Sequence, residues 1–168
     1  MTNLMIKLRR SPRTLLERDG YPGPGPGHLA VVMARAGVGK TAFLVGIGID
    51  ALLSGQKVLH ISLERTIDKV RDWYDDLLME MLRREKKLEL WAAIQLEVER
   101  RRHIHAYLKS SFSVERFNQA LELVESAMDF KPNVIIVDQP DFDAIDRETM
   151  EGLRALAAKA GAELWMSC

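Results

Sequence analysis

Residues 34–41 read Ala34-Arg35-Ala36-Gly37-Val38-Gly39-Lys40-Thr41 and lie between the apolar run Leu29–Met33 and a helical pattern that begins near Gly39. A strand, a glycine-rich loop, a Lys-Thr pair and a helix in this order are typical of a phosphate-binding loop. The glycines let successive backbone N–H groups turn inward around a phosphate, and the N-terminus of the following helix attracts the same anion. The residues that we expect to bind the nucleotide are Ala34, Arg35, Ala36, Gly37, Val38, Gly39, Lys40, Thr41 and Ala42.

Two side chains of this loop have expected roles. Lys40 can reach the β and γ phosphates, and the Thr41 hydroxyl can bind Mg²⁺. The usual pattern has a glycine at its first position, where this chain has Ala34. Alanine needs a negative φ there but leaves the cradle from Gly37 to Thr41 intact. The alternative is a glycine-rich turn from a strand to a helix that contains a lysine by chance.

The composition indicates one domain without a strong charge. The chain has 168 residues and 47% hydrophobic content, enough for one core. Its 24 basic and 24 acidic residues give no net field that would attract nucleic acid or an anionic membrane. The single cysteine, Cys168, excludes an internal disulfide. Without a signal peptide or an apolar stretch near the ~20 residues that span a bilayer, the protein is expected to be cytoplasmic.

The Pro/Gly-rich segment Gly20–Gly27 divides the sequence into an N-terminal arm with its loop, residues 1–28, and a domain, residues 29–168. Strands that alternate with helices predict an α/β domain with a parallel sheet, whose ligands bind at the carboxyl ends of the strands. The predicted strands are Leu29–Met33, Val58–Ser62, Ile104–Leu108, Val134–Asp138 and Glu163–Ser167. The predicted helices are Lys40–Ser54, Ile67–Arg102 in two pieces, Val114–Asp129 and Arg147–Ala160.

Two of the predicted strands end in a carboxylate. The run Val134–Val137 is typical of a buried strand, and Asp138 at its end would hold Mg²⁺ together with Thr41. The alternative for Asp138 is a helix or turn cap. Glu64 follows the strand Val58–Ser62 and could activate the water that attacks a nucleotide. Its alternative is a surface glutamate that leads into the next helix.

The order of these elements resembles the RecA-like ATPase core, and most closely its DnaB-type helicase and KaiC-like branches. Beside the phosphate loop, the resemblance is carried by Ser62-Leu63-Glu64, Ser113-Val114-Glu115, Val137-Asp138 and Leu164-Trp165-Met166-Ser167. The resemblance implies a three-layer P-loop NTPase fold, with a mostly parallel five-stranded sheet and helices on both faces. It also implies ATP and Mg²⁺ as ligands and Glu64 as the catalytic base.

The chain departs from this family at its end. Cys168 stands where DnaB-type proteins usually have Gln, and the strands that would supply DNA-binding loops and trans-acting lysine and arginine fingers would follow Cys168. We therefore expect a core truncated after the sensor strand, Glu163–Ser167, and the resemblance does not carry helicase activity over to this chain. The resemblance places the strand Leu29–Met33 beside this sensor strand. We expect its other edge to be covered by Leu4–Leu8 or by another copy of the chain, because exposed strand edges invite association.

Three functions remain open from the sequence. The first is a slow ATPase, in which Lys40 and Glu64 act on Mg-ATP. The second is a regulatory or interaction module that binds nucleotide with little turnover, as a homo-oligomer or with a partner protein. The third, disfavoured by the lack of an arginine-rich lid, is a small-molecule kinase. Basic clusters such as Arg100–Arg102 could contact nucleic acid, but interspersed glutamates favour a solvated face of mixed charge.

Overall fold

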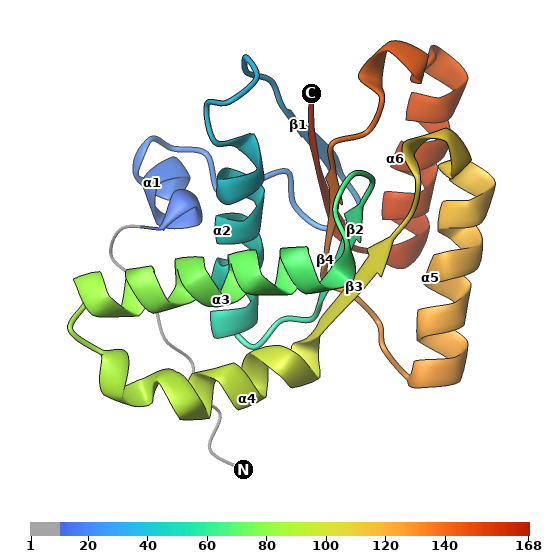
Figure 1. Cartoon of the computed structure of the whole chain (residues 1–168). Coiled ribbons are helices and arrows are strands. Elements are labelled where there is room, and N and C mark those ends of the chain that lie inside the picture. Colours follow the sequence, from blue (N-terminus) through green and yellow to red (C-terminus); the bar gives the residue numbers. More distant parts are fainter. Residues whose placement is uncertain (1–10) are drawn as a thin grey trace.

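The computed structural model describes residues 11–168. Its centre is a five-stranded parallel sheet in the order β1-β5-β4-β2-β3 (Figure 1). The strands are β1 (Leu29–Val32), β2 (Val58–Ser62), β3 (Arg102–Ala106), β4 (Val134–Asp138) and β5 (Glu163–Ser167). Helices cover both faces of this sheet, so the predicted three-layer α/β class is confirmed.

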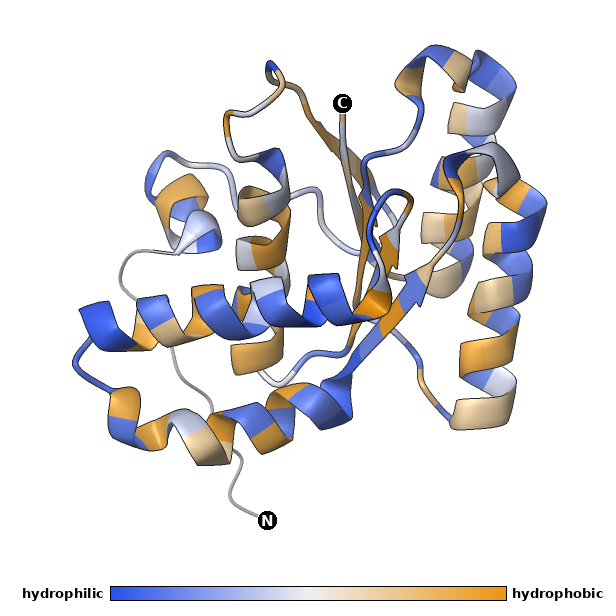
Figure 2. Cartoon of the chain, viewed as in Figure 1, coloured by the Kyte–Doolittle hydropathy of each residue, from blue (hydrophilic) through white to orange (hydrophobic). Residues whose placement is uncertain are grey.

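The helices form two groups. One face carries α1 (Pro12–Arg18), α2 (Lys40–Leu53), α3 (Ile67–Arg84) and α4 (Trp91–Arg101), whereas α5 (Val114–Met128) and α6 (Arg147–Ala160) lie on the other (Figure 1). Short 3₁₀ turns are η1 (Leu88–Leu90), η2 (Lys109–Ser111) and η3 (Phe142–Ala144). Hydrophobic and hydrophilic residues alternate along α3 and α5 in Figure 2, as expected for helices that pack one side on a sheet.

Most predicted bounds agree with the structure, and the differences have local causes. The predicted bounds of β2, β4, β5 and α6 are correct, while α2 and α5 each end one residue early because Ser54 and Asp129 are their C-caps. The expected break in the long helical region falls at Glu85–Lys87, where Lys86 has φ of 57°. The predicted strand Ile104–Leu108 starts two residues too late.

The early start of β3 follows from Arg102. Its guanidinium is almost fully buried, forms ion pairs with Asp75 and Glu99, and lies 4.8 Å from the centre of the Tyr74 ring. These partners belong to α3 and α4. Their contacts bury Arg102, which is the first residue of the strand. A basic residue at this position would be assigned to the surface from the sequence alone.

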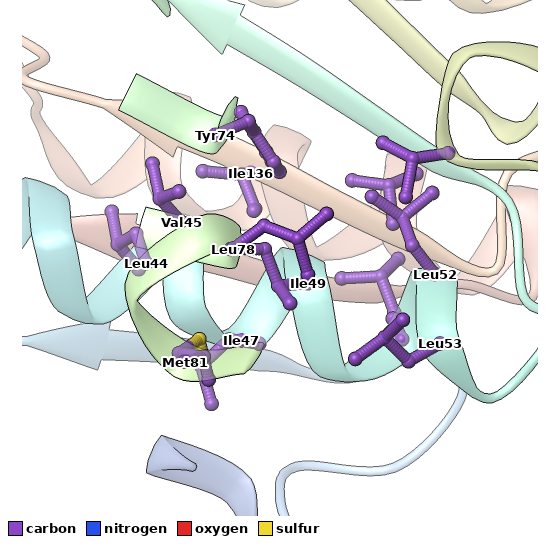
Figure 3. Close-up of a cluster of buried hydrophobic side chains, with 14 of the residues drawn as sticks. Leu44, Val45, Ile47, Ile49, Leu52, Leu53, Tyr74, Leu78, Met81 and Ile136 are labelled. Atoms are coloured by element: carbon purple, nitrogen blue, oxygen red, sulfur yellow. The ribbon is translucent and has the colours of Figure 1, made fainter. Parts of the chain in front are cut away.

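The helix α2 is the centre of the larger core. Every residue from Leu44 to Leu53 is buried, because the sheet, α1, α3 and α4 all contact this helix. Figure 3 shows Leu44, Ile47 and Ile49 of α2 among side chains of α3 and β4. Two glycines of α2 permit close approach: a Cβ at Gly46 would lie 2.5 Å from Pro12, and one at Gly48 would lie 2.5 Å from the Tyr74 hydroxyl.

The helix α1, which the sequence did not predict, ties the segment before β1 to the domain. The backbone N–H of Arg13 donates to the Asp50 carboxylate at 3.0 Å, and its guanidinium pairs with Glu163 of β5. β1 pairs with β5, as expected from the resemblance, and has no second neighbour among strands of residues 11–168. The segment Leu4–Leu8, expected to cover that edge, lies outside the described residues.

The buried His60 makes stability depend on pH. His60 lies on β2 with Nδ1 3.1 Å from the Tyr74 hydroxyl, and burial, aided by the charge of Arg102, lowers its pKa to about 3. The unfolded chain takes up this proton near pH 6.5, but the folded protein resists it until about pH 3. This group therefore destabilises the folded state progressively as pH falls through that window.

We expect the free energy of unfolding to fall by about 2 kcal/mol more in wild type than in His60→Asn between pH 7 and pH 5. Asparagine cannot titrate, and its amide oxygen can still accept the Tyr74 hydroxyl. Urea denaturation of both proteins at the two pH values measures the difference. Equal losses in the two proteins would contradict the prediction.

Candidate functional site

The loop between β1 and α2 has the backbone of an anion cradle. Residues 33–39 are exposed, and Gly37 and Gly39 have φ of 79° and 95°, which L side chains rarely adopt. Gly39 is the N-cap of α2 and offers no side-chain cap, so the first amides of the helix remain available to an anion. Ala34 is not among the residues with positive φ, as its replacement of glycine requires.

Lys40 arches back over this loop. Its ammonium donates hydrogen bonds to the carbonyl oxygens of Ala34 at 2.6 Å and Arg35 at 3.3 Å. The side chain therefore places its charge on the inside of the loop that begins at Ala34. A phosphate that entered the cradle would meet both the helix amides and this ammonium.

Thr41 and Asp138 meet at the base of the loop, although 97 residues separate them. The Thr41 hydroxyl donates to Oδ1 of Asp138 at 3.3 Å. The Ser167 hydroxyl donates to the same oxygen at 3.1 Å, and the side-chain amide of Gln139 donates to the Thr41 hydroxyl at 3.2 Å. α2, β4 and β5 thus contribute one connected group of oxygen ligands.

The Asp138 carboxylate is held where its charge is costly. Burial raises its pKa, and so does the negative charge of Glu64, while hydrogen bonds from Thr41 and Ser167 and the charge of Arg65 lower it. A carboxylate whose ionised form is disfavoured by burial gains most from a cation at its free oxygen. The hydroxyl and carboxylate oxygens are the ligands that Mg²⁺ prefers, so this donor set fits that metal.

Glu64 lies at the same edge of the sheet, in the turn that follows β2. Ser62 is in register with Asp138, and the N–H of Leu63 donates to the Asp138 carbonyl at 3.2 Å. Glu64 is exposed and makes no hydrogen bond or ion pair with residues 11–168. The N-cap of α3 is Thr66, so Glu64 is not used to begin that helix.

The structure adds residues that the sequence analysis missed. Gln139 has φ of 59°, a conformation that costs energy for a residue other than glycine and that clusters at functional sites. Its N–H donates to the Ser167 hydroxyl at 2.9 Å, which holds the strained residue in place. Arg65 enters the site as a positive charge near Asp138. Their positions beside Asp138 and Glu64 in the sequence were the available signal.

The basic clusters that could contact nucleic acid are largely paired. Arg83 and Arg84 form ion pairs with Glu80, and Arg100 and Arg101 do so with Glu97. These pairs form the mixed-charge face that the interspersed glutamates suggested.

No protein-family model matches the chain, and no curated protein is significantly similar to it in sequence. Within residues 11–168, no helix has both the length and the apolar character needed to cross a bilayer. The same part of the chain contains no cluster of three His, Cys, Asp or Glu residues suited to a metal ion. A metal at Asp138 would therefore need oxygen ligands from Thr41, water and a bound phosphate.

Ser167 is expected to stabilise the site. In Ser167→Ala the N–H of Gln139 loses its acceptor and Asp138 loses a donor, which should lower the free energy of unfolding by about 1–3 kcal/mol. Urea denaturation measures the change. The control is Ser126→Ala on the exposed side of α5, which should stay within about 0.5 kcal/mol of wild type. Equal effects of the two variants would show that the buried hydroxyl does not hold the site together.

Proposed function

We propose that this protein binds Mg-ATP at residues 34–42 and hydrolyses it slowly, as a RecA-like P-loop ATPase core. The observation that carries the proposal is the contact between Thr41 and Asp138 directly below a loop whose glycines have left-handed backbones. A phosphate-binding loop and a carboxylate that can share one metal ion are the two parts that P-loop NTPases require.

The order of the strands supports the RecA-like assignment. β5 lies between β1, which leads into the loop, and β4, which ends in Asp138. The resemblance in sequence places the sensor strand beside the loop strand, and β5 occupies that position. Pairing of β5 with both neighbours explains how Ser167 reaches the Asp138 carboxylate.

Each part of the site has a role in this proposal. The amides of residues 36–41 bind the phosphate oxygens, and Lys40 neutralises charge on the β and γ phosphates. Thr41 and Asp138 hold Mg²⁺ directly or through water, and the ion supplies charge neutralisation and orientation of the phosphates. Glu64 accepts the proton of the attacking water.

One observation favours the alternative, a module that binds nucleotide and has little turnover. The Glu64 carboxylate is exposed, and no side chain or backbone group of residues 11–168 orients it by a hydrogen bond. A general base that is not held in place contributes less to the rate. In this alternative the nucleotide changes affinity for a partner protein or for another copy of the chain.

Lys40→Ala should abolish measurable binding of Mg-ATP, because Lys40 is the side-chain cation that the loop itself encloses. Titration with a fluorescent ATP analogue measures the affinity, and circular dichroism verifies that the fold persists. The control is Lys131→Ala, which removes an exposed lysine just before β4, at the opposite edge of the sheet. Unchanged affinity in Lys40→Ala would refute the proposed site.

Glu64→Gln should separate binding from chemistry. Glutamine has nearly the same size as glutamate but is not basic, so ATP should bind normally while steady-state turnover falls roughly 10²–10⁴-fold. Glu125→Gln, an exposed position on α5, is the matched control. If Glu64→Gln turned over ATP as fast as wild type, Glu64 would be a surface residue without a catalytic role. If wild type bound ATP without hydrolysing it, the regulatory alternative would be favoured.

A further inference from the structure

Arg65 occupies the turn at the carboxyl end of β2, between Glu64 and the N-cap of α3. Its backbone N–H donates to the Ser62 hydroxyl at 3.0 Å, and Ser62 is in register with Asp138 of β4. The turn is tied to β4 a second time by the hydrogen bond from the Leu63 N–H to the Asp138 carbonyl. The backbone of Arg65 is thus fixed beside the Thr41–Asp138 pair.

Arg65 forms no ion pair with any of residues 11–168, and its Nε has no hydrogen-bond acceptor there. Three arginines of residues 11–168 have a buried nitrogen without a hydrogen-bond acceptor, namely Arg13, Arg65 and Arg102. Arg13 pairs with Glu163, and Arg102 pairs with Asp75 and Glu99. Arg65 forms no ion pair, so its buried Nε carries a desolvation cost that an incoming anion would offset.

Trp73 and Asp138 define where the guanidinium lies. The central carbon of the group is 5.4 Å from the centre of the Trp73 ring, within the range of a cation–π contact. Trp73 in turn lines an open hollow of about 330 Å³ together with Ala42, the residue that follows Thr41 in the first turn of α2. The positive charge of Arg65 also acts on the Asp138 carboxylate. Through Trp73 and Asp138, Arg65 is therefore linked to Ala42 and Thr41 in the first turn of α2.

We propose that Arg65 is a catalytic arginine supplied in cis, whose guanidinium contacts the terminal phosphate of a nucleotide bound at residues 34–42. The proposal rests on the ATPase function proposed above. Three features of the structure support it: the fixed turn, the buried Nε without an acceptor, and the contact with Trp73 close to the Thr41–Asp138 pair. Trp73 holds the guanidinium on a ring that cannot neutralise it, which keeps the cation available to a phosphate.

The reaction step balances without a proton transfer by Arg65. The oxygen of water forms a bond with the γ-phosphorus, and the bond from that phosphorus to the β–γ bridging oxygen breaks. The bridging oxygen keeps the electron pair and leaves with ADP, while a water proton passes to the Glu64 carboxylate. Arg65 stays protonated throughout and donates hydrogen bonds to the γ-phosphate oxygens, whose charge is redistributed in the transition state.

An arginine in this role has a large and specific effect. Arginines that contact the transferring phosphoryl group accelerate NTP hydrolysis roughly 10³–10⁵-fold, whether they come from the same chain or from a partner. A lysine does not replace the planar, bidentate donor. An arginine in cis also predicts that turnover per chain is independent of protein concentration, because no neighbouring copy has to complete the site.

The test compares wild type, Arg65→Ala and Arg65→Lys with the control Arg71→Ala. Arg71 is an exposed arginine on α3 that forms ion pairs with Asp68 at 3.5 Å and with Glu99 at 4.0 Å. Calorimetry measures affinity for Mg-ADP alone and for Mg-ADP with aluminium fluoride, which mimics the transferring phosphoryl group. In Arg65→Ala and Arg65→Lys, we expect ADP affinity within about twofold of wild type and affinity for the mimic at least ~100-fold weaker. Arg71→Ala should match wild type in both measurements.

Each result decides the proposal. The proposal would be overturned if Arg65→Ala changed the affinities for Mg-ADP and for the mimic equally, or changed neither. Arg65 would then serve only the contact with Trp73. The proposal would also be overturned if the wild type bound Mg-ADP with aluminium fluoride no more tightly than Mg-ADP alone. Wild type that binds no nucleotide would instead refute the ATPase function itself, so the two failures are distinguishable. Turnover per chain that rises with protein concentration would show that a neighbouring copy supplies the missing charge.

Discussion

The hydrogen bonds to the Asp138 carboxylate are the interaction on which the candidate site depends. Burial disfavours the charge of this group, and hydroxyls from two other elements, Thr41 of α2 and Ser167 of β5, offset part of that cost. The same bonds join the helix that follows the loop to two central strands. These hydrogen bonds position the side chains before any ligand binds, and positioning is what phosphoryl transfer, the proposed chemistry, chiefly needs from a protein.

The loop owes its position to the burial of α2. A helix that is apolar on nearly every side must be enclosed, and the sheet with α1, α3 and α4 encloses it. Gly46 and Gly48 let Pro12 of α1 and Tyr74 of α3 approach the helix more closely than any residue with a Cβ would permit. The first turn of α2 therefore projects from a densely packed core, with its free amides at the carboxyl ends of the strands. That edge is where ligands of parallel α/β sheets bind.

The chemistry at this edge is divided between fixed and exposed groups. Thr41, Asp138 and Ser167 are held by one another, whereas Glu64 stands exposed in the turn after β2. Arg65 follows it with a buried nitrogen that has no partner within residues 11–168. Under the proposed function, the groups that would bind phosphate and metal are therefore preformed, whereas Glu64 and Arg65 would be oriented only when a nucleotide binds. This division fits both a slow ATPase and a nucleotide-dependent switch, and it locates the difference between them in two adjacent residues.

From β1 onward, the sequence by itself determined the order of the strands and α-helices and most of their bounds to within one or two residues, because apolar periodicity, glycine placement and helix caps are local properties. It also singled out Lys40, Thr41, Glu64 and Asp138, since each follows or begins a recognisable element. Only the tertiary structure decided the start of β3, where Arg102 is buried by partners from two helices. Three further features could not be predicted from the sequence. They are the strained backbone of Gln139, the docking of α1 through Arg13, and the buried Nε of Arg65 without an acceptor. Each depends on which distant residue lies nearby to accept a hydrogen bond or neutralise a charge, and that is settled by packing.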